Sequence, residues 1–600
     1  MDRGTNKASG NNLRVTVKKT ASDQIKIVAD TPLYTITRIM TNQAYRVQVS
    51  DTITNKTNQD IGLIWQHLAG YNQIPQYGAK LAGQTNATQI KYFGSCNPTI
   101  FIRHKDSALA LVAEDTVSRA QMVMNTVANC FSMGTDGLGI AAGKSVKLDW
   151  LIYPLGANKD YFDFINQLRR DWDVNKTILG PYKIHASAIP GIKFQIASVA
   201  PWYQYGEASL LSDEEYIAKI KNTCERLRKA CPGVKLLGQI ETNLVPFDAG
   251  KYSWGKEFPL TYGNRKDPRT RYAQFTTADL TEKLESVSPY KDSLIRDANG
   301  NAMIDNYYVY QPIPLINLMV QPERGNYRYK RFFEQIDFLM DKAGLNGVYI
   351  DQFIPYLVGG YSENRWDGYT VILDESGKIK NKRYSYAITG ATARADIVKY
   401  VIKKGGYVIT NGHPISREEQ NSGVISFQEM ENDLINPVFF MDQKPPECRW
   451  QTAGHLATPI ILGLRPNTHQ QAVTDGRDRR AEILTKGIIT ALRNGQLHYY
   501  YSTEIPRTGQ YAGGVELSNL MFPFTPVELH EGYLIGKERT ITAISGTFTV
   551  SGAKAPRISC FNIFGNPVEA NCKVTGSAGA WQVECKLKDW NEVVIIEVQD

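Results

Sequence analysis

Short stretches in which apolar and polar residues alternate fill the first part of the chain. The runs LRVTVKK, YRVQVSDTITN and ALALVAE alternate or are rich in residues that favour strands, and turn residues separate them. No long helical periodicity interrupts these runs. Many short strands without helices predict an N-terminal β-sandwich, which we place at residues 1–158.

A helical pattern then replaces the strand pattern at residues 160–175. Phe162, Ile165 and Leu168 fall on one face of a helix with this spacing. We therefore expect a linker helix within residues 159–184 that packs between two domains.

From about residue 190, strands alternate with amphipathic helices. One helix follows Ser212, a candidate N-cap with Glu215 at capping-box spacing, and another ends at Gly344. The strands predicted by this pattern are 193–200, 234–242, 315–322, 347–353, 407–414, 424–432, 457–465 and 498–504. Eight strands that are mostly separated by helices predict a (β/α)8 TIM barrel over residues 185–510. An open doubly wound sheet is the alternative, but it would usually carry a glycine-rich phosphate loop after its first strand, and the sequence has none there.

Strand patterns return in the last part of the chain. The runs LIGKERTITAISGTFTVSG, PRISCFNIFG and NEVVIIEVQ predict a C-terminal β-sandwich over residues 511–600. Cys560, Cys572 and Cys585 fall in this region, where one disulfide and buried free thiols are both consistent with the sequence. The expected fold class is therefore multidomain, with a β-sandwich on each side of the barrel.

Charge and composition narrow the range of partners. The 600 residues include 68 Lys and Arg against 60 Asp and Glu, without a dense basic run, so we expect no nucleic-acid partner. No apolar run reaches the ~18 residues that a membrane-spanning helix needs. The opening MDRGTNKASGNN lacks the apolar segment of a signal peptide. We favour a periplasmic or secreted location, with the signal removed from this chain; the alternative is the cytoplasm.

The stretch GVYIDQF ends a buried strand pattern with an aspartate. Active sites of closed parallel barrels form at the C-terminal ends of the strands. Because side chains alternate along a strand, Tyr349 and Asp351 should face the barrel axis while Val348 and Ile350 face the helices. We expect Asp351 at the mouth of the barrel, on its fourth strand, and Tyr349 among the substrate-binding residues.

The sixth predicted strand, VISFQEMEN, repeats this pattern. Phe427, Glu429 and Glu431 share a face, so two glutamates can enter the same mouth as Asp351. Converging carboxyls raise the pKa of one of them, which creates an acid able to donate a proton near neutrality. Glycoside hydrolysis uses such a pair: one carboxyl protonates the leaving oxygen, and the other attacks the anomeric carbon or activates water, without a cofactor. Which glutamate is the acid/base, and whether the reaction retains or inverts configuration, stay open at this point.

Polar and aromatic residues near the other predicted strand ends are candidates for binding the substrate. Flat rings suit stacking on sugar faces, while carboxylates, amides and arginine suit hydroxyls or a substrate charge. The candidates are Trp202, Tyr203, Glu241, Gln352, Trp366, Asn411, His413 and Arg465. For each of them, packing or pairing with a neighbour is the structural alternative.

The order of these parts resembles the retaining α-glycosidases of the melibiase (α-galactosidase) clan. The stretches GVYIDQF, RWDGYTVILDESGKI and PVELHEGYLIGKERTI also resemble a bacterial glycoside-hydrolase-like family associated with polysaccharide degradation. The resemblance implies that Asp351 is the nucleophile. It also implies an acid/base on the sixth strand, typically Asp in the clan, for which Glu429 is the candidate here and Glu431 the second.

The resemblance thus implies a retaining, α-galactosidase-like glycosidase that acts on an α-linked sugar in an oligo- or polysaccharide. The alternative function is a catalytically inactive, carbohydrate-binding barrel. A metal-dependent hydrolase of the same fold would need a cluster of histidines and carboxylates. The chain has only eight histidines, without an H-x-H at the end of the first predicted strand, so we expect no metal.

Overall fold

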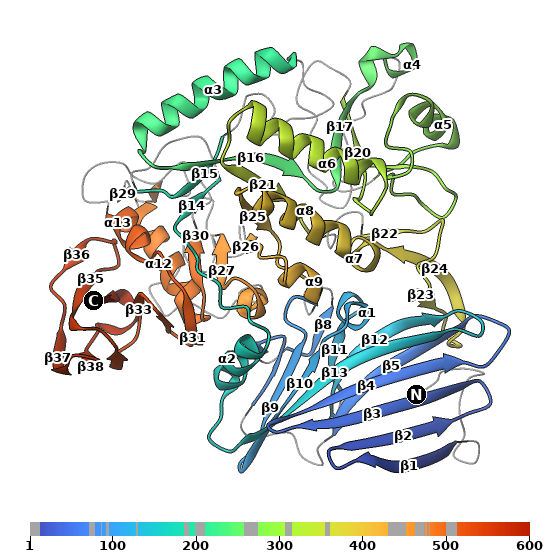
Figure 1. The fold of residues 1–600 in the computed structure, drawn as a ribbon, viewed down its shortest axis with the longest axis horizontal. Helices are drawn as coiled ribbons and strands as arrows, with labels where there is room; N and C mark the ends of the chain where they lie inside the picture. Colours follow the sequence, from blue (N-terminus) through green and yellow to red (C-terminus); the bar gives the residue numbers. More distant parts are fainter. Residues whose placement is uncertain are drawn as a thin grey trace.

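A computed structural model gives the fold of the chain (Figure 1). The residues that it describes are 13–70, 78–85, 87–91, 95–127, 130–184, 191–197, 211–256, 274–305, 315–354, 360–429, 452–462, 473–474, 477–478, 480–499 and 513–600.

Two antiparallel sheets form the N-terminal part, drawn in blue in Figure 1. The nine-stranded sheet has the order β1 (Arg14–Ala21), β2 (Gln24–Asp30), β3 (Tyr34–Gln43), β4 (Arg46–Asn55), β13 (Ser145–Gly156), β10 (Ser107–Ala113), β9 (Thr99–Arg103), β6 (Ala79–Leu81) and β7 (Gln84–Thr85). The second sheet contains β5 (Ile61–Gly70), β8 (Gln89–Lys91), β11 (Val123–Val127) and β12 (Cys130–Ile140). Ile53, Leu138 and Trp150 are buried in the core that the two sheets share. This sandwich-like arrangement agrees with the alternating pattern of the sequence.

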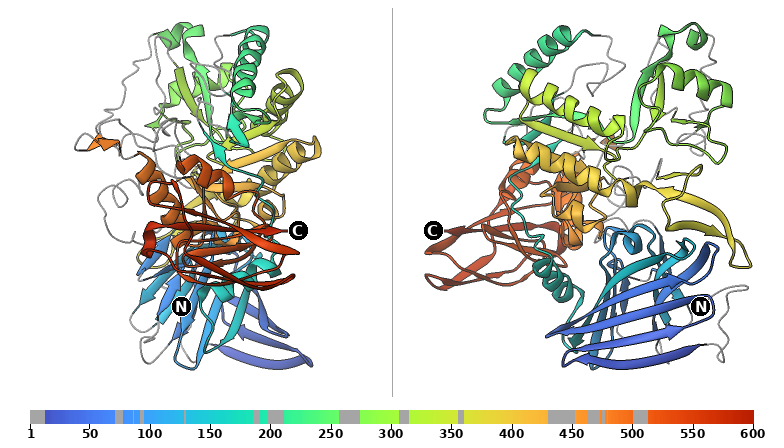
Figure 2. Two further views of the ribbon diagram at one scale, coloured as in Figure 1. Left: turned by 90° about the vertical axis from the view of Figure 1, so that its left-hand side faces the viewer. Right: turned by 45° about the vertical axis from the view of Figure 1, so that its right-hand side comes forward.

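The second sheet is completed by a segment that comes much later in the chain, after the fourth strand of the predicted barrel. This segment forms β22 (Tyr361–Ser362), β23 (Thr370–Leu373) and β24 (Ile379–Ser385). Strand β23 pairs with β12 through Leu138 and Thr370, which gives the order β22-β24-β23-β12-β11-β8. The insertion that follows Asp351 thus belongs to the N-terminal sheet, and it lies beside that sheet in Figure 2.

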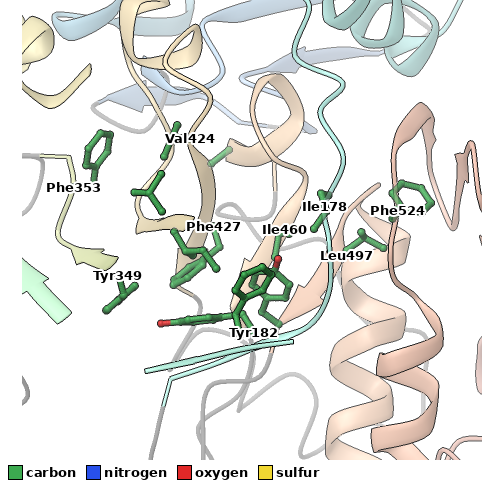
Figure 3. Packing of buried hydrophobic residues seen from close by; sticks show 14 of the residues in the cluster. Ile178, Tyr182, Tyr349, Phe353, Val424, Phe427, Ile460, Leu497 and Phe524 are labelled. Carbon is green, nitrogen blue, oxygen red and sulfur yellow. The ribbon is translucent and has the colours of Figure 1, made fainter. Parts of the chain in front are cut away.

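Eight parallel strands form the central sheet. They are β14 (Tyr182–Lys183), β15 (Phe194–Ile196), β16 (Lys235–Glu241), β21 (Gly347–Asp351), β25 (Tyr407–Asn411), β26 (Ile425–Glu429), β27 (Ile460–Leu462) and β30 (Leu497–Tyr499), in this order. The rings of Tyr182 and Tyr499, from the two ends of that order, lie 5.7 Å apart between centroids. Both also lie near Phe427, at 5.5 and 6.3 Å. The sheet therefore curls into a nearly closed barrel whose interior is filled by side chains (Figure 3).

One predicted barrel strand, 315–322, is wrong. Strand β20 (Leu315–Met319) lies instead in a separate antiparallel sheet with β17 (Leu244–Asp248), β18 (Gln274–Phe275) and β19 (Met303–Asp305). Apolar runs of this length do not reveal which sheet they join. The barrel gains β14 in its place, from within the expected linker. Asp351 and Glu429 therefore still end the fourth and the sixth strand.

Helices surround the barrel and connect it to its neighbours. The α-helices are α1 (Thr116–Ala120), α2 (Tyr161–Asp171), α3 (Asp213–Ala230), α4 (Ser253–Lys256), α5 (Ala278–Val287), α6 (Tyr327–Asp337), α7 (Tyr386–Thr389), α8 (Ala391–Lys403), α9 (Arg417–Gln420), α12 (Arg480–Arg493) and α13 (Gly513–Leu520). Helix α3 begins with the capping box of Ser212 and Glu215, as the sequence predicts. In α2, Asn166 donates to the Leu529 carbonyl at 2.9 Å and Arg169 donates to the His455 carbonyl at 2.7 Å. Helix α2 thus contacts both the barrel and the C-terminal part. None of the helices in the described ranges is long and apolar enough to cross a membrane.

The C-terminal part contains two antiparallel sheets. One has the order β31 (Pro526–His530), β32 (Tyr533–Gly536), β33 (Arg539–Thr542), β39 (Val593–Gln599), β35 (Lys554–Phe561) and β36 (Pro567–Val568); the other has β34 (Gly546–Val550), β38 (Ala580–Cys585) and β37 (Cys572–Ser577). Buried side chains of both sheets, including Phe548, Val583 and Ile596, share one core. Cys572 faces Cys585 in the register of β37 and β38, and the two Sγ atoms lie 2.8 Å apart as free thiols.

Candidate active site

Asp351 lies at the C-terminal end of β21, where three donors converge on one oxygen of its carboxylate. The Tyr349 hydroxyl, the Gln352 backbone N–H and the Asn411 side-chain amide each donate to Oδ1 at 2.9 Å. The Asp351 carbonyl accepts from the Thr242 N–H at 3.1 Å and from its hydroxyl at 2.8 Å. The side chain and the backbone of Asp351 are therefore both fixed.

The backbone turns sharply just after Asp351. Gln352 has a φ of +47°, in the left-handed region that residues with a side chain rarely adopt. This conformation accompanies the bond from the Gln352 N–H to the preceding Asp351 carboxylate. Backbone strain of this kind costs on the order of 1–3 kcal/mol and is concentrated at functional sites. The strained residue is one that the sequence indicates for the site, although its φ could not be read from the sequence.

Asn411, at the end of β25, links the two carboxylates that the sequence analysis paired. Its Nδ2 donates to Asp351 Oδ1 at 2.9 Å and to Glu429 Oε2 at 2.6 Å. Because both bonds share Nδ2, the two carboxylate oxygens cannot lie further apart than these two bond lengths placed end to end. Asp351 and Glu429, from the fourth and sixth strands, are thus on the same end of the barrel and face each other across one amide.

A third carboxyl, that of Glu241, comes from the neighbouring strand β16. The parallel register places Glu241 beside Asp351, and the residue is 4% exposed. Gln239 Nε2 donates to Glu241 Oε1 at 2.9 Å. Burial, and then the charge of Asp351, raise the pKa of Glu241 well above its usual value. A carboxyl that holds its proton more strongly than usual therefore lies beside Asp351.

Aromatic rings form the floor beneath these carboxyls. Tyr349 is fully buried, and its ring is stacked with that of Phe427 at 6.1 Å between centroids (Figure 3). Burial, followed by the charge of Asp351, raises the pKa of Tyr349 well above its usual value, so the phenol stays a donor to Asp351. The expected inward direction of Tyr349 and Asp351 agrees with these contacts, but Tyr349 contacts the carboxylate from below rather than lying on the open surface of the site.

Two sequence-predicted residues lie away from this cluster. His413 is fully buried; its Nδ1 is 2.9 Å from the Ser426 hydroxyl, and burial lowers its pKa to about 3, so it is a neutral core residue. The ring of Trp366 packs next to Gly139 of β12 and donates to the Thr370 carbonyl at 3.1 Å. Both contacts of this ring belong to the N-terminal sheet. Closeness in sequence to a strand end was therefore a misleading guide for these two residues.

Four other candidates, Trp202, Tyr203, Glu431 and Arg465, lie outside the described residues.

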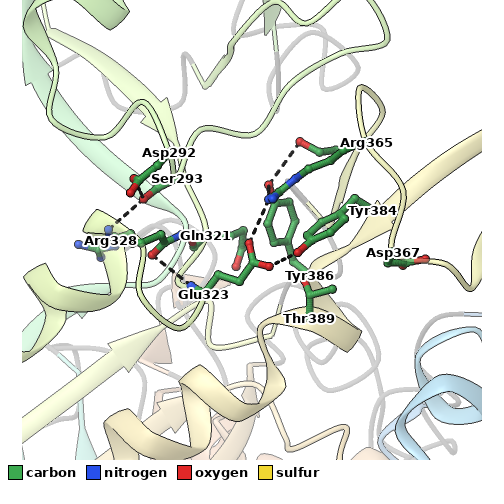
Figure 4. Close-up of polar contacts among 12 residues, drawn as sticks. Asp292, Ser293, Gln321, Glu323, Arg328, Arg365, Asp367, Tyr384, Tyr386 and Thr389 are labelled. Carbon is green, nitrogen blue, oxygen red and sulfur yellow. Dashed lines mark hydrogen bonds and ion pairs between the residues drawn. The ribbon is translucent and has the colours of Figure 1, made fainter.

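Arg328, which no pattern in the sequence indicates, supports the end of β16. This residue of α6 is 1% exposed, and its guanidinium donates to the Thr242 carbonyl at 3.2 Å and to the Glu241 carbonyl. Its backbone N–H donates to the Ser293 hydroxyl at 2.9 Å (Figure 4). A single arginine in a helix gives no sequence signal for burial, because most arginines face water.

A polar cluster fixes the insertion beside the site (Figure 4). Glu323 accepts from Arg365 at 3.1 Å and from the Tyr384 hydroxyl, and the Arg365 guanidinium lies 3.6 Å from the centre of the Tyr384 ring. These contacts connect the loop after β20 to the segment that carries β22 and β24. Within the described ranges, no group of three or more His, Cys, Asp and Glu residues is arranged to hold a metal ion.

Comparison with known proteins gives weak likenesses. No protein-family model matches the chain, and no curated protein matches it. Three solved structures share 10% sequence identity with it. The galactosidase domain of the α-galactosidase–sucrose kinase AgaSK is similar over 100% of this chain and 85% of its own, with a TM-score of 0.45. A GH31 family sulfoquinovosidase from E. rectale is similar over 100% of this chain and 92% of its own, also at 0.45. The α-N-acetylgalactosaminidase NagBb from Bifidobacterium bifidum is similar over 90% of this chain and 89% of its own, at 0.47. Likeness at this level carries no argument about chemistry, which therefore rests on the geometry of the site.

Proposed function

We propose that the protein is a retaining glycoside hydrolase with Asp351 as nucleophile and Glu429 as acid/base. The observation that carries the proposal is the shared Asn411 amide, whose Nδ2 reaches the two carboxylates through bonds of 2.9 and 2.6 Å. Retaining glycosidases hold their two carboxyls about 5–5.5 Å apart, whereas inverting ones need about 6.5–9.5 Å for a water molecule. Two oxygens bridged by a single nitrogen atom through these bonds lie no further apart than the shorter separation, and too close for the longer one.

The reaction would proceed in two displacements. Asp351 attacks the anomeric carbon while Glu429 protonates the leaving oxygen, which gives a covalent glycosyl–Asp351 ester. Glu429, now ionised, takes a proton from water, and that water cleaves the ester. The charge of Asp351 favours the protonated form of Glu429 before the attack, and the loss of this charge in the ester favours the ionised form afterwards. Asn411, which donates to both groups, keeps them aligned through both steps.

An α-linked sugar in an oligo- or polysaccharide is the substrate class that we propose, in a periplasmic or secreted setting. Support comes from the resemblance to the melibiase clan of the domain order, with an aspartate at the end of the fourth strand and an acid on the sixth. Trp202, Tyr203 and Arg465 stay proposed substrate-binding residues, and Gln352 is proposed to contact the sugar next to Asp351.

The test is a screen of aryl α- and β-glycosides and polysaccharides, with the Asp351→Asn protein as control. The first substrates are the α-galactosides, α-N-acetylgalactosaminides and α-sulfoquinovosides that the names of the three structures suggest. We expect hydrolysis whose first product, observed by NMR, keeps the anomeric configuration, and no hydrolysis by Asp351→Asn. Equal rates for both proteins would contradict the assignment of Asp351. Sugar binding in calorimetry without any product would favour the carbohydrate-binding alternative.

A further inference from the structure

A buried carboxyl, that of Glu241, lies next to the half-buried carboxyl of Asp351 at the ends of neighbouring strands. In the parallel register of β16 and β21, Glu241 is the partner of Asp351. Thr242, the next residue, donates from both its N–H and its hydroxyl to the Asp351 carbonyl, so the two strand ends are held at a fixed distance. Glu241 is 4% exposed, and water cannot separate the two carboxyls easily. Their contact is therefore a built feature of the barrel.

Two carboxyls on the same face of neighbouring strands repel each other strongly when both are ionised, so one of them tends to hold a proton. Asp351 Oδ1 accepts from three donors, so this oxygen is an acceptor in the structure and not the site of a proton. Glu241 is the more deeply buried of the two, and burial disfavours its charge. The proton therefore belongs on Glu241.

We propose that Glu241 is a positioning residue that stays protonated and donates a hydrogen bond to the Asp351 carboxylate. The pair then carries one negative charge, located on the group that attacks the sugar. This inference rests on the proposed function in taking Asp351 as the nucleophile. It also replaces the expectation that Glu241 binds substrate hydroxyls, because the carboxyl is buried against Gln239 and Asp351.

Some of the charged and titratable groups around Glu241 raise its pKa, and others lower it. Asp351 on β21 favours the protonated form of Glu241, and the charge of Arg328 on α6 opposes it. Arg328 bonds to the backbone carbonyl of Glu241. Tyr349 on β21 lies in the field of Glu241, Asp351 and Glu429 of β26. Burial and Asp351 are the two largest influences on the pKa of Glu241, and both raise it.

The test compares the thermal stability of the wild-type protein and of Glu241→Gln between about pH 4 and pH 9, which needs no substrate. Gln keeps the size of Glu and an N–H donor towards Asp351, but it cannot titrate. The pKa of Glu241 is raised in the folded state, so the unfolded chain releases this proton above about pH 4.5 while the folded protein keeps it. The unfolding equilibrium of the wild-type protein therefore shifts towards unfolding by up to tenfold per pH unit relative to the variant.

We expect the melting temperature of Glu241→Gln minus that of the wild type to increase steadily as the pH rises from about 4.5. The same comparison in an Asp351→Asn background should show a smaller increase, because the neighbouring charge is gone. The exposed Glu225→Gln provides the matched control, with a pH-independent difference. A difference between Glu241→Gln and wild type that does not change with pH would overturn the proposal.

If Glu241→Gln does not fold, infrared spectroscopy of the wild type and of Asp351→Asn provides a second measurement. The wild type at neutral pH should show the band of a protonated carboxyl. As the pH is raised, this band should disappear at a lower pH in Asp351→Asn than in the wild type. Identical titration of the band in the two proteins would contradict the proposal. Both measurements report only on the proton of Glu241 and need no substrate. A failure of the glycosidase assays would contradict the proposed function, and it can therefore be distinguished from a failure of this proposal.

Discussion

Two buried glutamates, Glu419 and Glu241, lie in opposite electrostatic surroundings. Glu419 Oε1 accepts from Arg394 Nε at 2.6 Å, and its Oε2 accepts from the backbone N–H groups of Ile415 and Ser416 at 2.8 and 2.9 Å. Glu241 faces another carboxyl, that of Asp351. A cation and backbone donors stabilise a charge, whereas a neighbouring acid keeps a proton in place. The comparison shows that two buried carboxyls can differ in the charge of their nearest partner, so burial alone does not determine how a carboxyl behaves.

Replacing Glu429 should give the largest effect on the reaction rate. It would show whether the partner of a carboxyl also matters for the proposed acid/base. We expect Glu429→Gln to lower kcat/KM by roughly 10²–10⁴-fold on substrates with a poor leaving group, because general acid assistance is lost. Substrates with an activated aryl leaving group should lose less in the first step, and added azide should restore turnover by replacing the water. Steady-state kinetics on both substrate types measures this difference.

Glu431→Gln is the matched control for Glu429→Gln, since both glutamates occur in VISFQEMEN. If Glu431→Gln shows the leaving-group dependence and Glu429→Gln does not, the roles of the two residues are exchanged.

Breaking the ion pair of Glu419 should affect stability rather than chemistry. Arg394 and Glu419 are 1% and 0% exposed at their side chains, so Arg394→Met leaves a buried charge without its cation. Loss of one partner of a buried pair costs about 3–5 kcal/mol of unfolding free energy. Urea denaturation followed by fluorescence measures this loss. If Arg394→Met loses less than about 1 kcal/mol of unfolding free energy, or has a lower kcat per folded molecule, Glu419 would not have the purely structural role that separates it from Glu241.

Removing the shared amide should reduce the rate moderately. We expect Asn411→Ala to lower kcat by roughly 10²-fold, because misalignment of two catalytic groups by about 1 Å has a cost of this order. The melting temperature should change little, since Asn411 is only half-buried. An unchanged kcat in Asn411→Ala, measured on the substrate from the screen, would mean that the two carboxylates are aligned without the amide.

The smallest effect concerns the alkaline side of the pH profile. In the wild type, deprotonation of Glu241 at high pH places a second negative charge beside Asp351 and should lower kcat/KM. Glu241→Gln keeps the donor without a titrating proton, so the decrease at high pH should begin at a higher pH than in the wild type. The pH dependence of kcat/KM for the two proteins checks this shift. If kcat/KM of the two proteins decreases at the same high pH, a group other than Glu241 causes the decrease.

The alternation of side chains along a strand predicted much of the site from the sequence. The inward direction of Tyr349, Asp351 and Glu429 follows from the two-residue period of strands, and all three lie in the cluster. Asn411 was also found from its place at a strand end, although its role as a bridge was not. Periodicity fixes which face a residue occupies, and so it works wherever a strand is long enough to show a pattern.

The features that the sequence did not predict depend on which strands pair and on contacts between distant parts of the chain. Strand β14 has only two residues, too few to show alternation, and β20 has an ordinary strand pattern but joins another sheet. Trp366 follows Asp351 closely in the chain, yet it lies between β22 and β23, two strands of the N-terminal sheet. Arg328 is buried by contacts with carbonyls of β16 and of the residue after it, which no local pattern encodes.

The pairing of β23 with β12 also decides how the molecule can be divided. A fragment that begins after the N-terminal sheets would keep β23 with a bare edge of unpaired N–H and C=O groups, which favours aggregation. The N-terminal sheets cannot be removed or exchanged as one continuous segment, because part of one of them comes from the middle of the chain. Attempts to shorten this protein should therefore begin elsewhere than at the boundary that a linear map of domains suggests.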